Sequence, residues 1–190
     1  MLMITKTLFP GRYIQGFRAI ERLENELPNF GEVGLCIMAP SAMKTLSGKI
    51  RERTAGLRLI FEEFCRECCD REIDRLANSG RECLTQFIVA IGGGKTIDTG
   101  KIVADRLNVP VVVVPTIAST DAPCSACAVV YSEEGVVIRI EYQKRNPDMV
   151  LVDSGIIASA PERFLISGMG DALATWFEAE SCRKTKSKNE

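Results

Sequence analysis

The stretch Phe87-Ile-Val-Ala-Ile-Gly-Gly-Gly-Lys-Thr-Ile-Asp98 leads from an apolar run through three glycines into a helical pattern. The apolar run predicts a strand buried on both faces, and a helix is expected over residues 95–107. Glycines at such a turn let the backbone approach a ligand, and the free N–H groups of the first helical turn attract an anion. The turn therefore suits a pyrophosphate, although a tight strand-to-helix turn without any ligand explains the glycines equally well.

The spacing of these glycines excludes two common nucleotide motifs. A Walker A loop needs glycine five residues before Gly94, where Val89 stands. The dinucleotide fingerprint needs glycine at position 97, where the chain has Ile97. Lys95 could neutralise phosphate or be solvated, and Asp98 either returns toward the ligand one helical turn later or compensates the helix dipole.

Short apolar runs alternate with amphipathic stretches along the chain, which predicts an α/β fold. The nearly all-valine run at 111–114 is typical of a central parallel strand. Ser41 and Asp70 are candidate N-caps of the helices that follow them. The other expected elements are strands at 33–38, 57–61 and 149–152, a hairpin at 128–140, and helices at 20–27, 41–53, 70–80 and from 165 onward.

We therefore expect a parallel-sheet, Rossmann-like nucleotide-binding domain over residues 1–160. Residues 161–182 are expected to be the first helix of a truncated, all-α second domain, and 183–190 a disordered polar tail.

The charge balance and the apolar runs of the chain indicate which binding partners and which cellular locations to expect. The chain has 24 basic and 25 acidic residues and a net charge of −1, so nothing favours nucleic acid or an anionic membrane. The sequence has neither an apolar run of about 18 residues nor a signal-peptide core, so a cytoplasmic protein is expected.

Eight cysteines include the pairs Cys65-x-x-Cys68 and Cys124-x-x-Cys127. The gap between the two pairs is far longer than in zinc ribbons, and a chain of this length without a secretory signal does not suggest a disulfide scaffold. We favour reduced cysteines that act as small hydrophobic residues.

Three blocks of sequence together resemble the glycerol dehydrogenases of the iron-containing (group III) alcohol dehydrogenase superfamily. They are Gly92-Gly-Gly-Lys-Thr-Ile-Asp98, Pro115-Thr-Ile-Ala-Ser-Thr-Asp-Ala-Pro123 and Gly168-Met-Gly-Asp-Ala-Leu-Ala-Thr-Trp-Phe-Glu-Ala179. The resemblance extends over residues 8–182 and is most specific from 88 to 182. It implies oxidation of glycerol to dihydroxyacetone, with NAD as hydride acceptor and zinc holding the substrate oxygen.

The resemblance also implies roles for individual residues. Asp121 would meet the glycerol hydroxyls, and Asp171 would be the carboxylate ligand of zinc. On sequence alone, an ordinary helix cap is the simpler role for Asp171. The residues that would bind NAD are Gly94, Lys95, Asp98, Thr116, Ser119, Ser125, Cys127 and Tyr131.

The chain departs from this pattern in two ways. The family's aspartate for the adenosine ribose is absent from Leu35-Cys-Ile-Met-Ala-Pro40, so we expect weak or altered adenosine recognition. The family's two histidine zinc ligands lie in a C-terminal domain, and this chain contains no histidine. We therefore expect the chain alone not to be a competent zinc dehydrogenase.

Two alternatives stay open at this point. One is a nucleotide-binding or oligomerisation module without chemistry. The other is a relative acting on phosphate substrates, such as a glycerol-1-phosphate dehydrogenase or a dehydroquinate synthase, although residues 116–128 contain no basic residue that would favour it. We also expect exposed apolar side chains at Leu173, Trp176 and Phe177, and hence a homo-oligomer.

Overall fold

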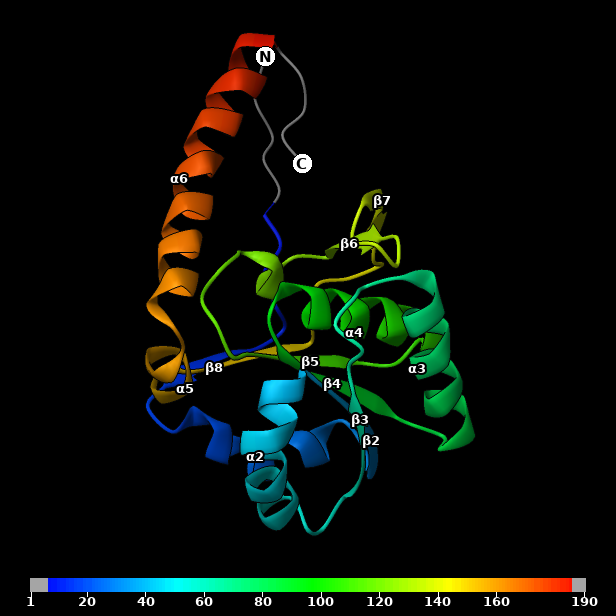
Figure 1. Cartoon of the computed structure of the whole chain (residues 1–190). Coiled ribbons are helices and arrows are strands. Elements are labelled where there is room, and N and C mark those ends of the chain that lie inside the picture. The colour runs from blue at the N-terminus through cyan, green and yellow to red at the C-terminus, as the bar shows by residue number, and fades with distance from the viewer. Residues whose placement is uncertain (1–6, 186–190) are drawn as a thin grey trace.

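The computed structural model describes residues 7–185 as a layered α/β structure (Figure 1). Its strands are β1 (Tyr13–Gly16), β2 (Val33–Met38), β3 (Arg58–Glu63), β4 (Phe87–Gly92), β5 (Val111–Pro115), β6 (Cys127–Tyr131), β7 (Val137–Tyr142) and β8 (Met149–Asp153). Its α-helices are α1 (Leu23–Glu26), α2 (Pro40–Arg53), α3 (Asp70–Glu82), α4 (Gly94–Leu107), α5 (Ser154–Ser159) and α6 (Glu162–Thr185). Short 3-10 turns cover Ala19–Arg22, Leu27–Asn29 and Ala122–Cys124.

Six parallel strands form one sheet in the order β1-β8-β5-β4-β2-β3, and β6 and β7 form a separate antiparallel hairpin. Every residue of β4 and β5 is buried, because helices cover both faces of the sheet. The predicted parallel, Rossmann-like sheet is therefore confirmed, and so is a helix at the C-terminal end.

Alternate residues of each central strand point into two separate cores. Leu35, Ile88 and Val113 pack with α3 and α4 on one face of the sheet. Cys36 and Val89 pack with α2 and the N-terminal helical turns on the other. Figure 1 shows the same division, with α2 on one side of the sheet and α3 and α4 on the opposite side.

The direction of chain winding reverses between two neighbouring strands. From β2 the chain crosses to β3 at one edge of the sheet, then returns to β4 on the other side of β2 and continues through β5 to β8. Ligands of open α/β sheets bind beyond the carboxyl ends of the strands at such a reversal. The glycines that follow β4 lie at this position.

Two predicted helix caps are wrong. Helix α2 begins at Pro40, whose fixed φ suits the first helical position, so Ala39 is the N-cap and Ser41 lies inside the helix. Cys69 is the N-cap of α3, and no side chain caps that helix. Asp70 instead accepts hydrogen bonds of 2.7 and 2.9 Å from Arg139, and this contact is long-range in sequence.

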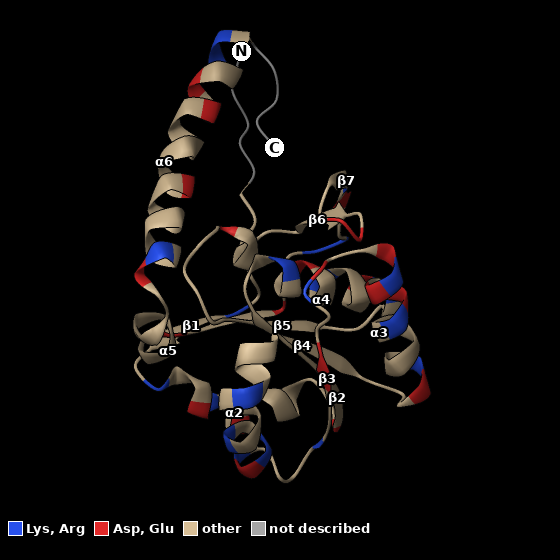
Figure 2. Ribbon diagram, in the orientation of Figure 1, with Lys and Arg blue, Asp and Glu red and all other residues tan. Residues whose placement is uncertain are grey.

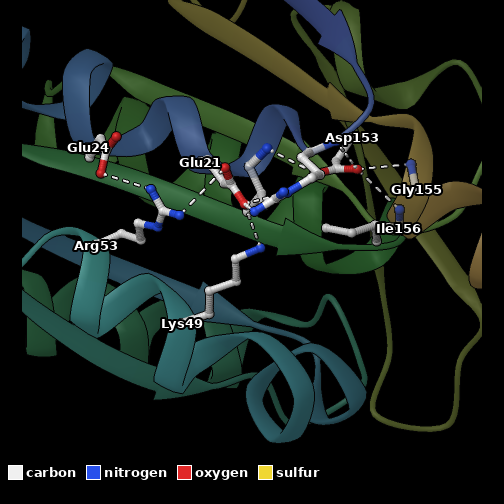
Figure 3. Close-up of polar contacts among 9 residues, drawn as sticks. Glu21, Glu24, Lys49, Arg53, Asp153, Gly155 and Ile156 are labelled. Atoms are coloured by element: carbon white, nitrogen blue, oxygen red, sulfur yellow. Dashed lines mark hydrogen bonds and ion pairs between the residues drawn. The ribbon is translucent and has the colours of Figure 1, made fainter.

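Asp153 joins the N-terminal segment to the carboxyl end of β8. Its buried carboxylate caps α5 by accepting the N–H groups of Gly155 (2.9 Å) and Ile156 (3.3 Å), as Figure 3 shows. The same carboxylate accepts the N–H groups of Arg18 and Ile20. These bonds fix the N-terminal turns against the sheet, and Lys49 and Arg53 of α2 reach Glu21 beside them (Figure 3).

Helix α6 extends away from the sheet, and none of its residues is buried (Figure 1, Figure 2). Leu173, Trp176 and Phe177 are exposed, as expected from the sequence. The helix continues to Thr185, so residues 183–185 are helical where we expected a disordered tail, and the rest of that tail lies outside the described residues. No helix between residues 7 and 185 is long and apolar enough to cross a membrane.

Candidate functional site

The turn from β4 to α4 leaves backbone N–H groups without partners. Gly93 is the N-cap in an extended conformation, and its carbonyl accepts the N–H of Ile97 at 3.0 Å. Within residues 7–185, no protein acceptor meets the N–H groups of Gly94, Lys95 or Thr96. Three orphan donors at the positive end of a 14-residue helix form a site for an anion.

Protein atoms also pack closely around the same turn. A Cβ at Gly92 would lie 3.0 Å from the Cβ of Ala39, and one at Gly93 would lie 2.8 Å from Ile117. The N–H of Thr116 donates to the carbonyl of Gly92 at 2.9 Å. Gly92 and Gly93 are therefore needed for close packing in any case. Within the described part of the chain, the first N–H groups of α3 are unpaired as well, so those of α4 indicate a ligand because they also lie at the reversal of chain winding.

Lys95 and Tyr131, two of the predicted cofactor residues, lie together. The Lys95 ammonium is 2.7 Å from a carboxylate oxygen of Glu67 and 4.3 Å from the centre of the Tyr131 ring. Burial raises the pKa of the Tyr131 phenol. Sequence analysis missed Glu67, because only the fold brings the loop between β3 and α3 beside α4.

Asp98 lies inside the structure. It is buried, its Oδ1 lies 3.0 Å from the ammonium of Lys101, and its Oδ2 accepts the N–H of Val129 at 3.0 Å. Burial raises the pKa of Asp98, and Lys101 opposes the shift without cancelling it. Asp98 thus connects α4 to the hairpin. This role differs from both interpretations of the sequence, in which Asp98 either faces a ligand or compensates the helix dipole.

Lys101 is the main residue that sequence analysis missed. Only 2% of this residue is exposed, and its ammonium donates to the carbonyls of Ala122 (3.0 Å), Ser125 (3.2 Å) and Cys127. A buried lysine needs such partners to keep its charge. Lys101 therefore fixes the segment that contains two predicted cofactor residues, Ser125 and Cys127.

The two predicted acidic residues also lie together. The N–H of Asp121 donates to the carboxylate of Asp171 at 3.2 Å, and both residues are exposed. A Cβ at Gly168 would collide with the carbonyl of Ala118, so only glycine lets α6 come this close to the loop. Asp171 lies in the middle of α6, which excludes the simpler role of a helix cap.

The loop after β5 lines an open, mainly apolar cavity. The cavity has a volume of about 670 Å³ and lies between β1, β8, α5 and this loop. Thr120 and Asp121 supply polar groups at its wall. Thr116 and Ser119, which are half-buried, belong to the same loop. The orphan backbone donors after β4 thus lie beside the loop after β5, which lines the apolar cavity and contains Asp121, and α6 brings Asp171 to the same loop.

The comparisons with known proteins agree with this arrangement. The sequence profile of the family described as iron-containing alcohol dehydrogenase matches residues 10–154. This chain belongs to that family. A glycerol dehydrogenase of Thermotoga maritima is 52% identical over 188 residues, which cover 98% of this chain and 51% of the relative. The chain thus spans about half the length of the curated relatives it matches.

Solved structures of the iron-containing alcohol dehydrogenase family share the fold. A probable glycerol dehydrogenase from Sinorhizobium meliloti 1021 superimposes with a TM-score of 0.89 at 42% identity, over 97% of this chain and 51% of that one. Sulfoacetaldehyde reductase from Bifidobacterium kashiwanohense, solved in complex with NAD+, gives a TM-score of 0.80 at 18% identity, over 93% and 53% of the two chains. The latter likeness concerns the fold alone.

The set of metal ligands is incomplete here for a zinc-dependent member of the iron-containing alcohol dehydrogenase family. The sequence has no histidine, and no group of three His, Cys, Asp or Glu side chains within the described residues could hold a metal ion. Asp121 and Asp171 offer only oxygen ligands, whereas catalytic zinc usually has three protein ligands that include nitrogen or sulfur. These residues alone do not form a zinc centre.

Three of the eight cysteines, Cys36, Cys68 and Cys69, are buried as small hydrophobic residues, whereas Cys65 is exposed and the other four are half-buried. None is in a disulfide within the part of the chain that the structure describes. Cys36 and Cys68 are buried in the two cores, and burial raises the pKa of each thiol to about 12. Neither thiol is therefore a nucleophile at neutral pH.

Proposed function

We propose that this chain is the dinucleotide-binding part of an NAD-linked polyol dehydrogenase of the glycerol dehydrogenase type. The observation that carries the proposal is the set of unpaired N–H groups at Gly94, Lys95 and Thr96, beside the reversal of chain winding. Sequence identity to glycerol dehydrogenases supports the substrate class. The chain shares its fold with sulfoacetaldehyde reductase, which was solved with NAD+, so this fold accommodates the proposed cofactor.

Different residues of the site bind the cofactor and the substrate. The N–H groups of Gly94 and Lys95 receive the pyrophosphate, and Thr116 and Ser119 continue that surface with hydroxyl groups. Ser125, Cys127 and Tyr131 line the nicotinamide end, in a segment that Lys101 and Asp98 fix. NAD, when bound, supplies the hydride acceptor.

Asp121 binds the hydroxyl groups of the polyol. Its exposed carboxylate can accept hydrogen bonds from two neighbouring hydroxyl groups, and the N–H bond to Asp171 holds the backbone of the loop in place. The apolar wall of the cavity suits the carbon chain of a small substrate and the nicotinamide ring. Asp171 contributes a carboxylate toward a metal whose other ligands are not present among residues 7–185.

Calorimetric titration of NAD into the purified chain tests the cofactor proposal. Saturable binding is expected, and Lys95→Ala should weaken it several-fold, because the change removes a positive charge beside the pyrophosphate. Lys144→Ala is the matched control, since Lys144 is an exposed lysine paired with Asp105. Absence of binding, or equal affinities in the two variants, contradicts the proposal.

A nucleotide-binding module without chemistry is the second candidate, and the incomplete set of metal donors favours it. Glycerol-dependent formation of NADH with added zinc tests whether this chain alone carries out any chemistry. Because the zinc ligands are incomplete, we expect NAD binding without appreciable turnover by this chain alone. Turnover comparable with that of ordinary dehydrogenases would refute the expectation.

The contacts of the Lys101 ammonium argue against the third function, that of a relative acting on phosphate substrates. The fold brings the ammonium of Lys101 to residues 122–127, and four protein oxygens already surround it. It therefore has no N–H group left to bind a substrate phosphate.

A further inference from the structure

The charge of Lys95 is already neutralised within the chain. Its ammonium lies 2.7 Å from Oε2 of Glu67 and 4.3 Å from the centre of the Tyr131 ring. Lys95 is the second residue of α4, so its side chain begins beside the N–H groups that have no acceptor within residues 7–185. A phosphate at this end of the helix therefore meets an ammonium that a carboxylate of the chain already holds.

Glu67 is the fixed member of this ion pair. Its Oε1 accepts the N–H of Cys68 at 3.1 Å, and its side chain is only 19% exposed. The turn of the hairpin packs beside it, because a Cβ at Gly135 would lie 3.4 Å from Oε2 of Glu67. The carbonyl of Cys68 accepts the N–H of Tyr131 at 2.8 Å, which joins the loop between β3 and α3 to β6. The loop and the hairpin thus hold the carboxylate of Glu67 in place.

Lys95 is the member that can move. Its side chain is 41% exposed, and among residues 7–185 Glu67 is its only ion-pair partner. An ammonium on a long flexible stem has three N–H donors that rotate freely, so it can change partners while the backbone stays in place. Water competes for a partly exposed ion pair and makes it weak. A phosphate that arrives at the start of α4 can therefore take the ammonium from Glu67.

We propose that Glu67 competes with the phosphates of the dinucleotide for Lys95 and thereby lowers the affinity of the site. The inference rests on the proposed function, because it takes the pyrophosphate to lie at the start of α4. When the cofactor binds, the ammonium of Lys95 passes from the carboxylate to a phosphate oxygen, and the ion pair that is lost reduces the gain. A moderate affinity suits a cofactor that leaves after each reaction, since product release limits the rate of many enzymes.

Glu67→Gln tests the competition. Its single amide oxygen can still accept the N–H of Cys68, but the side chain has no charge with which to hold Lys95. The affinity for NAD, measured by calorimetric titration, should rise about threefold to fivefold, the effect of one partly exposed ion pair. ADP, which contains two phosphates and no nicotinamide, should gain by a similar factor. A gain for NAD without a gain for ADP overturns the proposal.

Glu133→Gln is the matched control. Glu133 lies in the turn of the same hairpin and forms an ion pair with Arg71 at 2.8 Å, away from Lys95. Its neutralisation changes the net charge of the chain by the same amount, so both affinities should stay unchanged. An equal gain in Glu133→Gln and Glu67→Gln indicates an effect of overall charge and overturns the proposal.

A double-mutant cycle shows whether Glu67 acts through Lys95. In a Lys95→Met background no ammonium is left to compete for. The gain from Glu67→Gln should then fall below about 1.5-fold, because solvent and salt screen the repulsion that remains between carboxylate and phosphate. Circular dichroism spectra of the four proteins should coincide. A gain of unchanged size in the Lys95→Met background means that Glu67 affects the site by another route, and it overturns the proposal.

The outcomes separate this inference from the proposed function. If the wild-type chain binds neither NAD nor ADP, the proposed function is wrong and the inference falls with it. If the wild-type chain binds NAD and Glu67→Gln binds it equally well or more weakly, the cofactor site stands and the competition is wrong.

Discussion

The ammonium of Lys101 lies 3.0 Å from the carboxylate of Asp98, and both side chains are buried beneath the segment that contains Ser125 and Cys127. The two residues are one helical turn apart on α4. Asp98 bonds to the backbone of β6, while Lys101 bonds to the loop before it. The pair therefore fixes one wall of the candidate cofactor site.

Removing one member of this pair should be costly. Lys101→Met leaves a buried carboxylate and three carbonyl groups without their donor, so we expect a loss of about 3–5 kcal/mol in the free energy of unfolding. Urea denaturation measures the loss. Lys49→Met, which breaks an exposed ion pair with Glu21, is the control and should cost about 1 kcal/mol or less. Similar losses in the two variants would contradict the structural role of Lys101.

Two glycines of α6 should respond in opposite ways to alanine. A Cβ at Gly168 would collide with the carbonyl of Ala118, whereas a Cβ at Gly170 meets nothing within 4 Å. Gly170→Ala should stabilise the helix by up to about 1 kcal/mol, because alanine is the better helix former. Gly168→Ala should instead push α6 from the loop and break the bond between Asp121 and Asp171.

Amide exchange of Asp121 reports the contact between α6 and the loop. Its N–H should exchange faster in Gly168→Ala than in the wild-type chain, and at an unchanged rate in Gly170→Ala. If both variants leave the exchange rate of Asp121 unaltered, α6 does not hold the loop.

An acidic residue at the end of β2 should restore recognition of the adenosine ribose. Ala39 is the N-cap of α2 and lies beside Gly92, and the chain has no carboxylate at positions 35–40. Ala39→Asp should raise the affinity for NAD by roughly tenfold, the effect of one charged hydrogen bond of about 1.4 kcal/mol. Calorimetric titration of NAD into the two proteins measures the change.

The control for Ala39→Asp is Ala39→Asn. Asparagine caps a helix about as well as aspartate does, so both variants should be more stable than the wild-type chain. Only aspartate supplies the charge that the ribose hydroxyls favour. Equal NAD affinities in the two variants would show that the gain came from helix capping or that the ribose lies elsewhere.

The contact between α3 and the hairpin should weaken in acid. Arg139, through its hydrogen bonds, lowers the pKa of Asp70 below its ordinary value of 3.8. A carboxyl group with a lowered pKa stabilises the fold above its unfolded value, and this contribution is lost as the pH falls through the folded pKa. Amide protection in β6 and β7 should therefore decrease below pH 3.8. In Asp70→Asn that decrease should be absent, whereas Asp74→Asn, which leaves the Asp70 contact intact, should retain it.

Local patterns in the sequence predicted the central part of the fold. β4 and β5 are apolar at every position because both of their faces are buried, and glycines directly follow β4. β1 was missed because it is a short edge strand in which exposed and half-buried residues alternate. Tyr13 to Gly16 therefore carries little apolar signal, and only its pairing with β8 defines it as a strand.

Long-range contacts account for most of what the sequence did not predict in the candidate site. In the sequence, Lys101 is one polar residue of an amphipathic helix. Its buried position depends on carbonyl groups that lie more than 20 residues away along the chain. Asp70 was predicted as a cap from its local context, but a distant arginine binds it. Asp121 and Asp171, to which the resemblance gives separate roles, lie within hydrogen-bond distance of each other, which no spacing rule could show.

Backbone amide chemical shifts during titration with NAD test the central claim most directly, because they report which N–H groups meet the ligand. The account predicts saturable shifts of the amides of Gly94, Lys95 and Thr96, with weaker shifts at Thr116 and Ser119. Saturation that leaves the first turn of α4 unperturbed, or no shift at any NAD concentration, would contradict it.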